Sequence, residues 1–242
     1  MQISKYKKLK NNVYEITLEN NEKIKLYEDV ILKEELLLKK EITDIKRITE
    51  INSKYDVYNV ALKYLNHHVL SIKGMKEYLS KKNYQEVDIN ETIDKLIKKG
   101  YLNDSYYAKC YINDHVNLSN DGPYKMIKHL EENDISSSTY REYLSKYNSV
   151  WQDRIERYIN KNLKINKKSP YFFKSKMLMN LINLGYDKEM INDSLNKVTI
   201  SNLDELKEIE KEKIRKKLSR KYTGEELERK IREKLFQKGF FG

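Results

Sequence analysis

Few side chains in this sequence of 242 residues could bind a metal or attack a substrate. The histidines are His67, His68, His115 and His129, and none stands at helical ligand spacing with a cysteine or a carboxylate pair. A zinc site needs such spacing, so we do not expect one. Cys110 is the single cysteine, which excludes an internal disulfide and fits a reducing compartment. We expect it to be a small buried thiol rather than a nucleophile.

Two carboxylates, Asp104 and Asp114, lie on or near one predicted helix. They are ten residues apart and do not face one another closely enough to share a metal ion. Asp104 stands at the start of this helix, so we expect it to act as a helix cap. The sequence has neither a P-loop nor a dinucleotide-binding glycine motif. We therefore expect no catalytic residue, no metal, no cofactor and no enzyme activity.

Positive charge is concentrated in the C-terminal part of the sequence. Residues 1–150 carry a net charge of +2 and residues 151–242 one of +9, which together give the +11 of the whole sequence. Such asymmetry is typical of a protein that meets a polyanion, either nucleic acid or an acidic protein surface. Charge alone favours this interpretation no more than it favours the simple solubility of a lysine-rich protein.

Cations also recur on a helix that is repeated four times. Lys125, Lys176 and Lys230 occupy the same position in three copies, where the first copy has Gly74. Neighbouring cations extend each group, and we predict that together they bind a partner or DNA as a basic stripe. The stripe comprises Lys73, Lys76, Lys125, Lys128, Lys174, Lys176, Arg229, Lys230, Arg232 and Lys234. The alternative is that these residues form a solvated outer face.

A short pattern predicts where each of these helices ends. An apolar residue is followed by Leu at +4, by Gly, Asn or Asp at +8, and by an apolar residue at +9. The copies begin at Met75, Met126, Met177 and Ile231, which are 51, 51 and 54 residues apart. The +8 residues are Asn83, Asp134, Gly185 and Gly239. Because these residue types tolerate a left-handed conformation, we expect each copy to end in a Schellman cap, with the +4 and +9 residues in contact.

Start signals before each copy, and apolar residues after it, complete a three-helix unit. Ser71, Gly122-Pro123 and Ser169-Pro170 are typical helix starts, and Thr223 to Glu226 has the form of a capping box. A first helix is expected before each start, at residues 56–68, 105–117, 150–164 and 203–221. A third helix is expected after three of the caps, with buried pairs Ile89 and Ile93, Tyr140 and Leu144, and Ile191 and Leu195.

Residues 1–28 differ from the rest, because β-forming residues cluster around Asn11-Asn12 and Asn20-Asn21. We expect a small β-meander with asparagines of positive φ in its turns, followed by one or two short helices in residues 29–42.

The predicted fold is mainly α, an elongated curved array of three-helix repeats with a β-containing N-terminal module. The predicted domains are 1–54 (N-terminal module), 55–104, 105–149 and 150–200 (repeats 1 to 3), and 201–242 (an incomplete repeat 4). No membrane span or signal peptide is visible, so we expect a cytoplasmic protein, and a monomer.

Three tracts carry a resemblance to a known family. They are Ala61 to Leu65 with Ser71, the tract from Gly100 to Tyr111, and Gly122-Pro123 with Ile127 and Leu130. In this order and spacing they resemble the RecX family, modulators of the RecA recombinase, over essentially the whole sequence. The family usually has arginines where this sequence has His68 and Leu70, and an acidic residue where it has Gly74.

The resemblance implies a non-catalytic protein of three-helix repeats that lies in the helical groove of the RecA filament on single-stranded DNA. There it would limit filament growth and the ATP-dependent activities of RecA in DNA repair. The alternative from the residues is an independent DNA-binding protein, whose three-helix units place a helix in the major groove.

Overall fold

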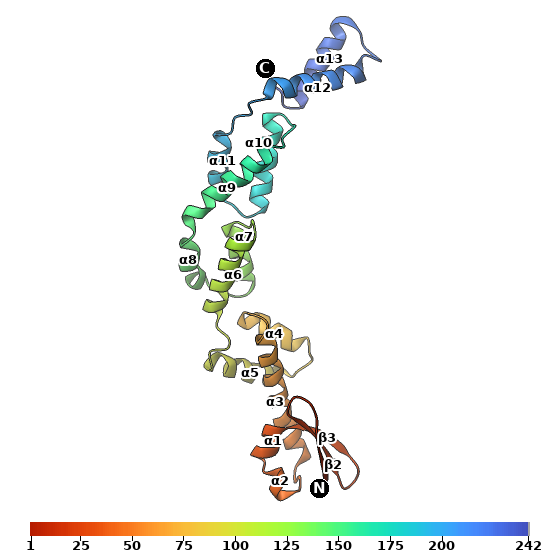
Figure 1. The fold of residues 1–242 in the computed structure, drawn as a ribbon, viewed down its shortest axis with the longest axis vertical. Helices are drawn as coiled ribbons and strands as arrows, with labels where there is room; N and C mark the ends of the chain where they lie inside the picture. Colours follow the sequence, from red (N-terminus) through yellow and green to blue (C-terminus); the bar gives the residue numbers. More distant parts are fainter. Residues whose placement is uncertain (242) are drawn as a thin grey trace. The chain divides into compact units, whose positions relative to one another are not determined.

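The computed structural model describes residues 1–241, which form a three-stranded sheet followed by thirteen helices (Figure 1). The chain divides into two compact units, Met1–Tyr107 and a second that begins at Ala108. The prediction of a mainly α fold with a small N-terminal β-module is confirmed.

The N-terminal sheet is an antiparallel meander of β1 (Ile3–Lys8), β2 (Val13–Leu18) and β3 (Lys23–Tyr27). Asn11 and Asn12, with φ of 59° and 55°, turn the chain between β1 and β2, and Asn21 with φ of 64° does so before β3. Asparagine tolerates this conformation better than most residues, which confirms the predicted role of these three. Asn20, the other asparagine of the second predicted turn, does not have a positive φ. Two short helices follow as expected, α1 (Glu28–Lys33) and α2 (Leu36–Lys39).

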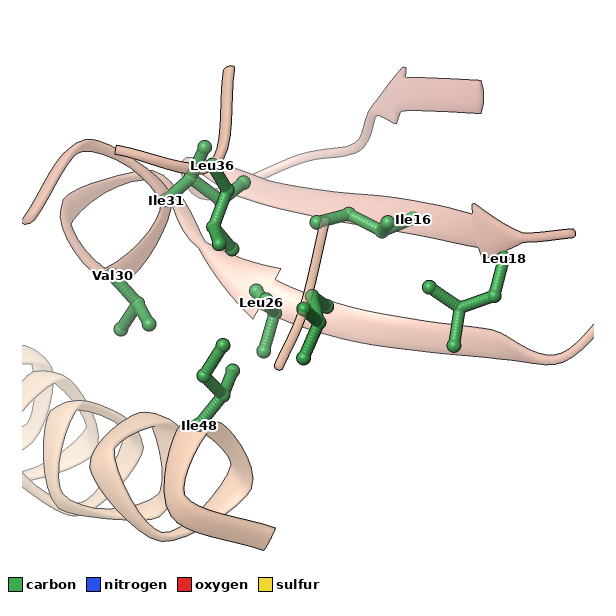
Figure 2. Close-up of a cluster of buried hydrophobic side chains, with 8 residues drawn as sticks. Ile16, Leu18, Leu26, Val30, Ile31, Leu36 and Ile48 are labelled. Carbon is green, nitrogen blue, oxygen red and sulfur yellow. The ribbon is translucent and has the colours of Figure 1, made fainter. Parts of the chain in front are cut away.

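The module buries its apolar residues in a cluster of its own. Ile16, Leu18 and Leu26 from the sheet face residues of the short helices and Ile48 of the next helix (Figure 2). Since three short strands cannot stabilise themselves alone, the helix that contributes Ile48 is part of this module's fold.

That helix, α3 (Ile45–Leu65), begins earlier than the sequence predicted. The expected start at residue 56 was wrong, because the Asp44 side chain accepts a hydrogen bond from the Arg47 backbone N–H at 2.9 Å and caps a helix of 21 residues. The boundary predicted between residues 54 and 55 therefore falls inside α3, which serves both the β-module and the first repeat.

Partly buried hydrogen bonds join the module to that repeat. The phenol groups of Tyr27, at the end of β3, and Tyr84 both donate to the carboxylate of Asp56 on α3, at 2.6 and 2.7 Å. Burial first, and then the Asp56 carboxylate, raise the pKa of both tyrosines. Asn52 of α3 adds a second link by accepting from the Tyr27 backbone N–H at 2.8 Å.

The remaining helices follow the predicted grouping into threes. After α3 come α4 (Ile72–Ser80) and α5 (Glu86–Lys98), then α6 (Asp104–Leu118), α7 (Pro123–Glu132) and α8 (Ser137–Ser145), then α9 (Asn148–Leu163), α10 (Pro170–Asn183) and α11 (Lys188–Asn196), and finally α12 (Leu203–Leu218) and α13 (Gly224–Gln237). The pairs predicted for the third helices are buried: Ile89, Ile93, Tyr140, Leu144, Ile191 and Leu195. The boundaries of the four repeats as domains stay a prediction.

All four residues predicted to be left-handed are so, and three of the four copies end in the predicted Schellman cap. Asn83, Asp134, Gly185 and Gly239 have φ of 62°, 60°, 86° and 75°. In each copy the N–H of this residue donates to the carbonyl three residues earlier, at 2.8 to 3.0 Å. In the last three copies the N–H of the next residue also donates to the carbonyl of the Leu at +4 of the pattern, as from Ile135 to Leu130 at 3.0 Å. This pair of bonds is the Schellman motif.

The helix starts agree only in part. Ser71 caps α4 by accepting from the Gly74 N–H, as expected. The capping box at Thr223 was wrong, since its side chain makes no capping hydrogen bond. Gly224, the first helical residue, has a φ of +57°, and this left-handed turn directs the chain away from the geometry that a capping box needs.

The assignment of Asp104 was also wrong in detail. Asn103 caps α6, because its side-chain oxygen accepts from the N–H groups of Ser105 and Tyr106 at 2.9 and 3.1 Å. Asp104 instead accepts from the Ile72 N–H at 2.8 Å, at the first turn of α4. It therefore holds the start of a different helix, an arrangement that its position in the sequence does not reveal.

Within the second unit, the caps also join successive repeats. The Gly122 N–H, at the start of α7, donates to the Leu184 carbonyl at 2.6 Å, and the Tyr124 N–H donates to the Gly185 carbonyl at 3.0 Å. At the next junction the Ser169 hydroxyl, at the start of α10, donates to the Lys238 carbonyl at 2.6 Å. The start of one second helix thus contacts the end of the next.

This contact leaves no room for a side chain at Gly185. A Cβ there would lie 2.4 Å from the Lys125 backbone nitrogen, whereas one at Gly224, also of positive φ, would meet nothing within 4 Å. Alanine at either site incurs a left-handed strain of about 1 kcal/mol, and at Gly185 a further steric cost of about 1–3 kcal/mol. We expect the free energy of unfolding, measured in urea, to fall clearly more for Gly185→Ala than for Gly224→Ala. Equal losses would contradict the close approach.

Candidate partner-binding surface

The residues of the predicted basic stripe lie on the second helix of each repeat. They are Lys73 and Lys76 on α4, Lys125 and Lys128 on α7, Lys174 and Lys176 on α10, and Arg229, Lys230, Arg232 and Lys234 on α13. Lys125, Lys176 and Lys230 each precede a buried residue, Met126, Met177 or Ile231. The caps therefore hold these three cations at equivalent positions on their helices. Their role in binding stays a prediction.

Several stripe cations are engaged by carboxylates of their own helix or its start. Lys125 lies 2.6 Å from Asp121, and Lys230 lies 2.9 Å from Glu233. Lys128 and Arg229 make longer contacts, of 3.9 and 4.0 Å. Burial alone would raise the pKa of Asp121, but the hydrogen bonds and charges of Lys125 and His115 outweigh it and hold the pKa below its usual range. These pairs reduce the charge that the stripe presents.

Five stripe cations are not paired with a carboxylate in this way. Within residues 1–241, no carboxylate lies at ion-pair distance from Lys76, Lys174, Lys176, Arg232 or Lys234. The Lys234 ammonium group donates to the neutral Gln237 amide oxygen at 2.9 Å. Lys76, Lys176 and Arg232 are exposed, and Lys174 is half-buried. An unpaired exposed cation keeps its full charge for an external partner. Lys76, Lys174, Lys176 and Arg232 are therefore the strongest candidates among the predicted residues, because the Lys234 ammonium group is already engaged by Gln237.

A second periodic feature lies beside the stripe and was missed by the sequence reasoning. The Tyr64 ring of α3 stacks on Tyr78 of α4 with centroids 3.8 Å apart, and Tyr111 of α6 stacks on His129 of α7 at 4.3 Å. At the third site the Tyr158 hydroxyl accepts from the Asn180 amide at 3.4 Å. These pairs join the first helix of a repeat to its second. Their signal in the sequence is the spacing of 47 residues between successive tyrosines.

His115 was considered above as a ligand or catalytic group, and it lies beside Ser119 and Asp121. Its Nδ1 atom lies 3.4 Å from the Ser119 hydroxyl and 3.1 Å from the Asp121 carboxylate. A catalytic triad needs the serine and the carboxylate on opposite ring nitrogens, so this cluster cannot relay a proton between them. It acts instead to tie the end of α6 to the start of α7.

Among residues 1–241, no group of three or more His, Cys, Asp or Glu side chains is placed to hold a metal ion. Cys110 is a free thiol. It was expected to be buried, but it is only half-buried. No helix in the described part of the chain is both long enough and apolar enough to cross a membrane.

The fold and surface define a class, the helical repeat proteins, which present extended surfaces to their partners. Comparison with known proteins identifies the family. The sequence is 30% identical over 248 residues to "Regulatory protein RecX" of Streptococcus pneumoniae (strain Hungary19A-6), covering 99% of this chain and 95% of that protein. The chain belongs to the RecX family.

Other relatives with the same name agree. Identity is 28% to the protein of Streptococcus gordonii, with 99% of this chain and 95% of that one covered. It is 27% to that of Oceanobacillus iheyensis, with coverage of 77% and 71%. No protein-family model matches the chain.

Two crystal structures share the fold. One, of regulatory protein RecX, has a TM-score of 0.64 and 20% identity, and covers 79% of this chain and 98% of its own. The other, of RecX from Lactobacillus salivarius, has a TM-score of 0.55 and 23% identity, and covers 61% and 97%.

The Tyr111–His129 stack predicts a pH dependence. Burial lowers the pKa of His129, and the charge of His115 lowers it further, while Glu132 opposes the shift. Because the folded-state pKa lies below the unfolded value of about 6.5, the unfolded chain binds more protons, and stability falls as the pH drops through 6.5. We expect the free energy of unfolding in urea to fall less between about pH 7.5 and 5.5 for His129→Tyr than for the wild type. This variant would place a tyrosine pair here like that of Tyr64 and Tyr78. An identical loss would contradict this assignment.

Proposed function

We propose that this protein binds the RecA filament on single-stranded DNA in its helical groove and limits filament growth and RecA's ATPase and recombinase activities in DNA repair. Membership of the RecX family is the observation that carries this proposal. The protein is proposed to act as a cytoplasmic monomer, without catalysis and without a cofactor.

The periodic surface supports this function. A nucleoprotein filament is itself periodic and carries negative charge, so cations at equivalent positions on successive second helices suit it. A binding function also fits the arrangement of His115, Ser119 and Asp121, which stabilises a helix junction and cannot act as a triad.

The first test is ATP hydrolysis by RecA on single-stranded DNA. A filament regulator changes the rate at substoichiometric concentrations, because one bound molecule affects the growth of a whole filament. An independent DNA-binding protein changes the rate only as it occupies the DNA, which requires stoichiometric amounts. The concentration at half-maximal effect therefore separates the two functions.

The second test is reversal of the unpaired stripe. Lys76→Glu, Lys176→Glu and Arg232→Glu together alter three second helices without breaking an ion pair among the described residues. We expect binding to RecA-coated single-stranded DNA to weaken by about tenfold, or about 1.4 kcal/mol, with the largest effect at low salt. Filament pull-down or biolayer interferometry measures it.

A matched control changes the charge equally on the third helices. Lys98→Glu, Arg141→Glu and Lys188→Glu replace exposed cations of α5, α8 and α11. We expect little effect on filament binding from this variant. If the two triple variants bind alike, the stripe is only a solvated face. Circular dichroism checks that both keep the wild-type fold.

A further inference from the structure

A basic groove that shares no residue with the stripe runs between the end of α6 and the length of α9. The cavity has a volume of about 760 Å³ and lies wholly within the second unit. One wall carries Asn117 and Asn120 from the end of α6 and the loop after it, and the other carries Arg154, Arg157 and Lys161 of α9. No carboxylate of the described residues lines it.

The three cations share one face of α9, because they are spaced three and four residues apart. Arg154 is fixed in place, since its guanidinium donates to the backbone carbonyls of Ser119 and Asp121. Arg157 and Lys161 are exposed, and neither has a carboxylate within ion-pair distance among residues 1–241. The groove therefore holds one anchored cation and two available ones.

The neighbouring groups favour a nucleic acid over an acidic protein. Tyr158 lies on the same face of α9 and Tyr147 at its beginning, so the groove has aromatic rings as well as cations. Backbone-tracking cations beside aromatic rings are typical of sites for single-stranded nucleic acid, and the Asn120 amide can donate to a phosphate oxygen. The Asn117 amide already donates to the backbone and side-chain oxygens of Asn113. A protein partner needs a buried apolar anchor at the centre of its site. Val116 and Val150 are the aliphatic residues of the lining, but both are half-buried among polar, aromatic and basic side chains and form no such anchor.

We propose that this groove binds the phosphodiester backbone of single-stranded DNA directly, with Arg157 and Lys161 on phosphates and Tyr158 beside the bases. The proposal rests on the proposed function, because binding to the filament is what brings the chain to single-stranded DNA. It assigns the contact with DNA to α9 and leaves the stripe of the second helices for the protein surface of the filament.

The test measures fluorescence anisotropy of a labelled oligothymidylate of about 20 nucleotides without RecA. We expect the variant with Arg157→Glu and Lys161→Glu to bind at least tenfold more weakly than the wild type. The slope of log binding constant against log salt concentration should be shallower for this variant by about 1.4, because two phosphate contacts are lost at about 0.7 each. Lys216→Glu with Lys217→Glu is the control, since it makes the same charge change at exposed sites on α12 outside the groove.

Equal binding by the two double variants would overturn the proposal. So would competition by poly-glutamate as strong as that by unlabelled oligothymidylate, since the groove would then take an acidic polypeptide. Arg154 is left intact because it supports the loop between α6 and α7.

RecA ATP hydrolysis separates this proposal from the proposed function. If the wild type binds oligothymidylate through Arg157 and Lys161 but leaves RecA unaffected, the groove stands and the regulatory function fails. If the wild type slows RecA and the groove variants bind oligothymidylate unchanged, the function stands and the groove fails.

Discussion

Contact between successive helix ends is the constraint on which the second unit depends. The backbone of Gly122 approaches the backbone of Gly185 so closely that a Cβ on Gly122 would lie 2.5 Å from the Gly185 carbonyl oxygen. The left-handed cap turns the chain so that carbonyls at a helix end accept bonds from the helix start of the preceding repeat. One residue thus ends a helix and joins two repeats. The orientation of the second helices, and of the cations on them, follows from these junctions.

The first unit is held together by a different interaction. There a single carboxylate, Asp56, accepts from two tyrosines that come from the β-module and from the turn after α4. Charge-assisted bonds of this kind are stronger than neutral ones, and a buried phenol without a partner is costly. Because α3 carries Asp56 and also Ile48 of the module's core, the β-module and the first repeat fold around one long helix. The β-module is therefore an integral part of this unit.

The cations of this protein fall into two groups with different consequences. Some, such as Lys125 beside Asp121, are partnered within the chain and contribute to helix starts. Others, such as Lys176, Arg157 and Lys161, are exposed and have no carboxylate at ion-pair distance among the described residues. Only the second group has its full charge available to a polyanion. Net charge therefore overstates the basic surface of α13, where Glu233 contacts both Arg229 and Lys230.

Much of the local structure could be predicted from the sequence. Left-handed caps are restricted to glycine and a few polar residues, so Asn83, Asp134, Gly185 and Gly239 identified four helix ends and the repeat itself. The family resemblance, based on tracts such as Gly100 to Tyr111, was confirmed by the relatives. The unpaired members of the stripe could not be identified in advance, because ion pairing depends on side-chain geometry.

Tertiary structure decided the contacts between residues far apart in the sequence. Local spacing indicated that Asp104 caps its own helix, yet its carboxylate accepts from the start of α4, 32 residues away. The groove of Arg154, Arg157 and Lys161 likewise needs the end of α6 as its second wall. A helix cap depends on residues within one turn, and the sequence displays them together. A groove depends on how two helices pack, and periodicity along the chain does not specify which side chains then meet.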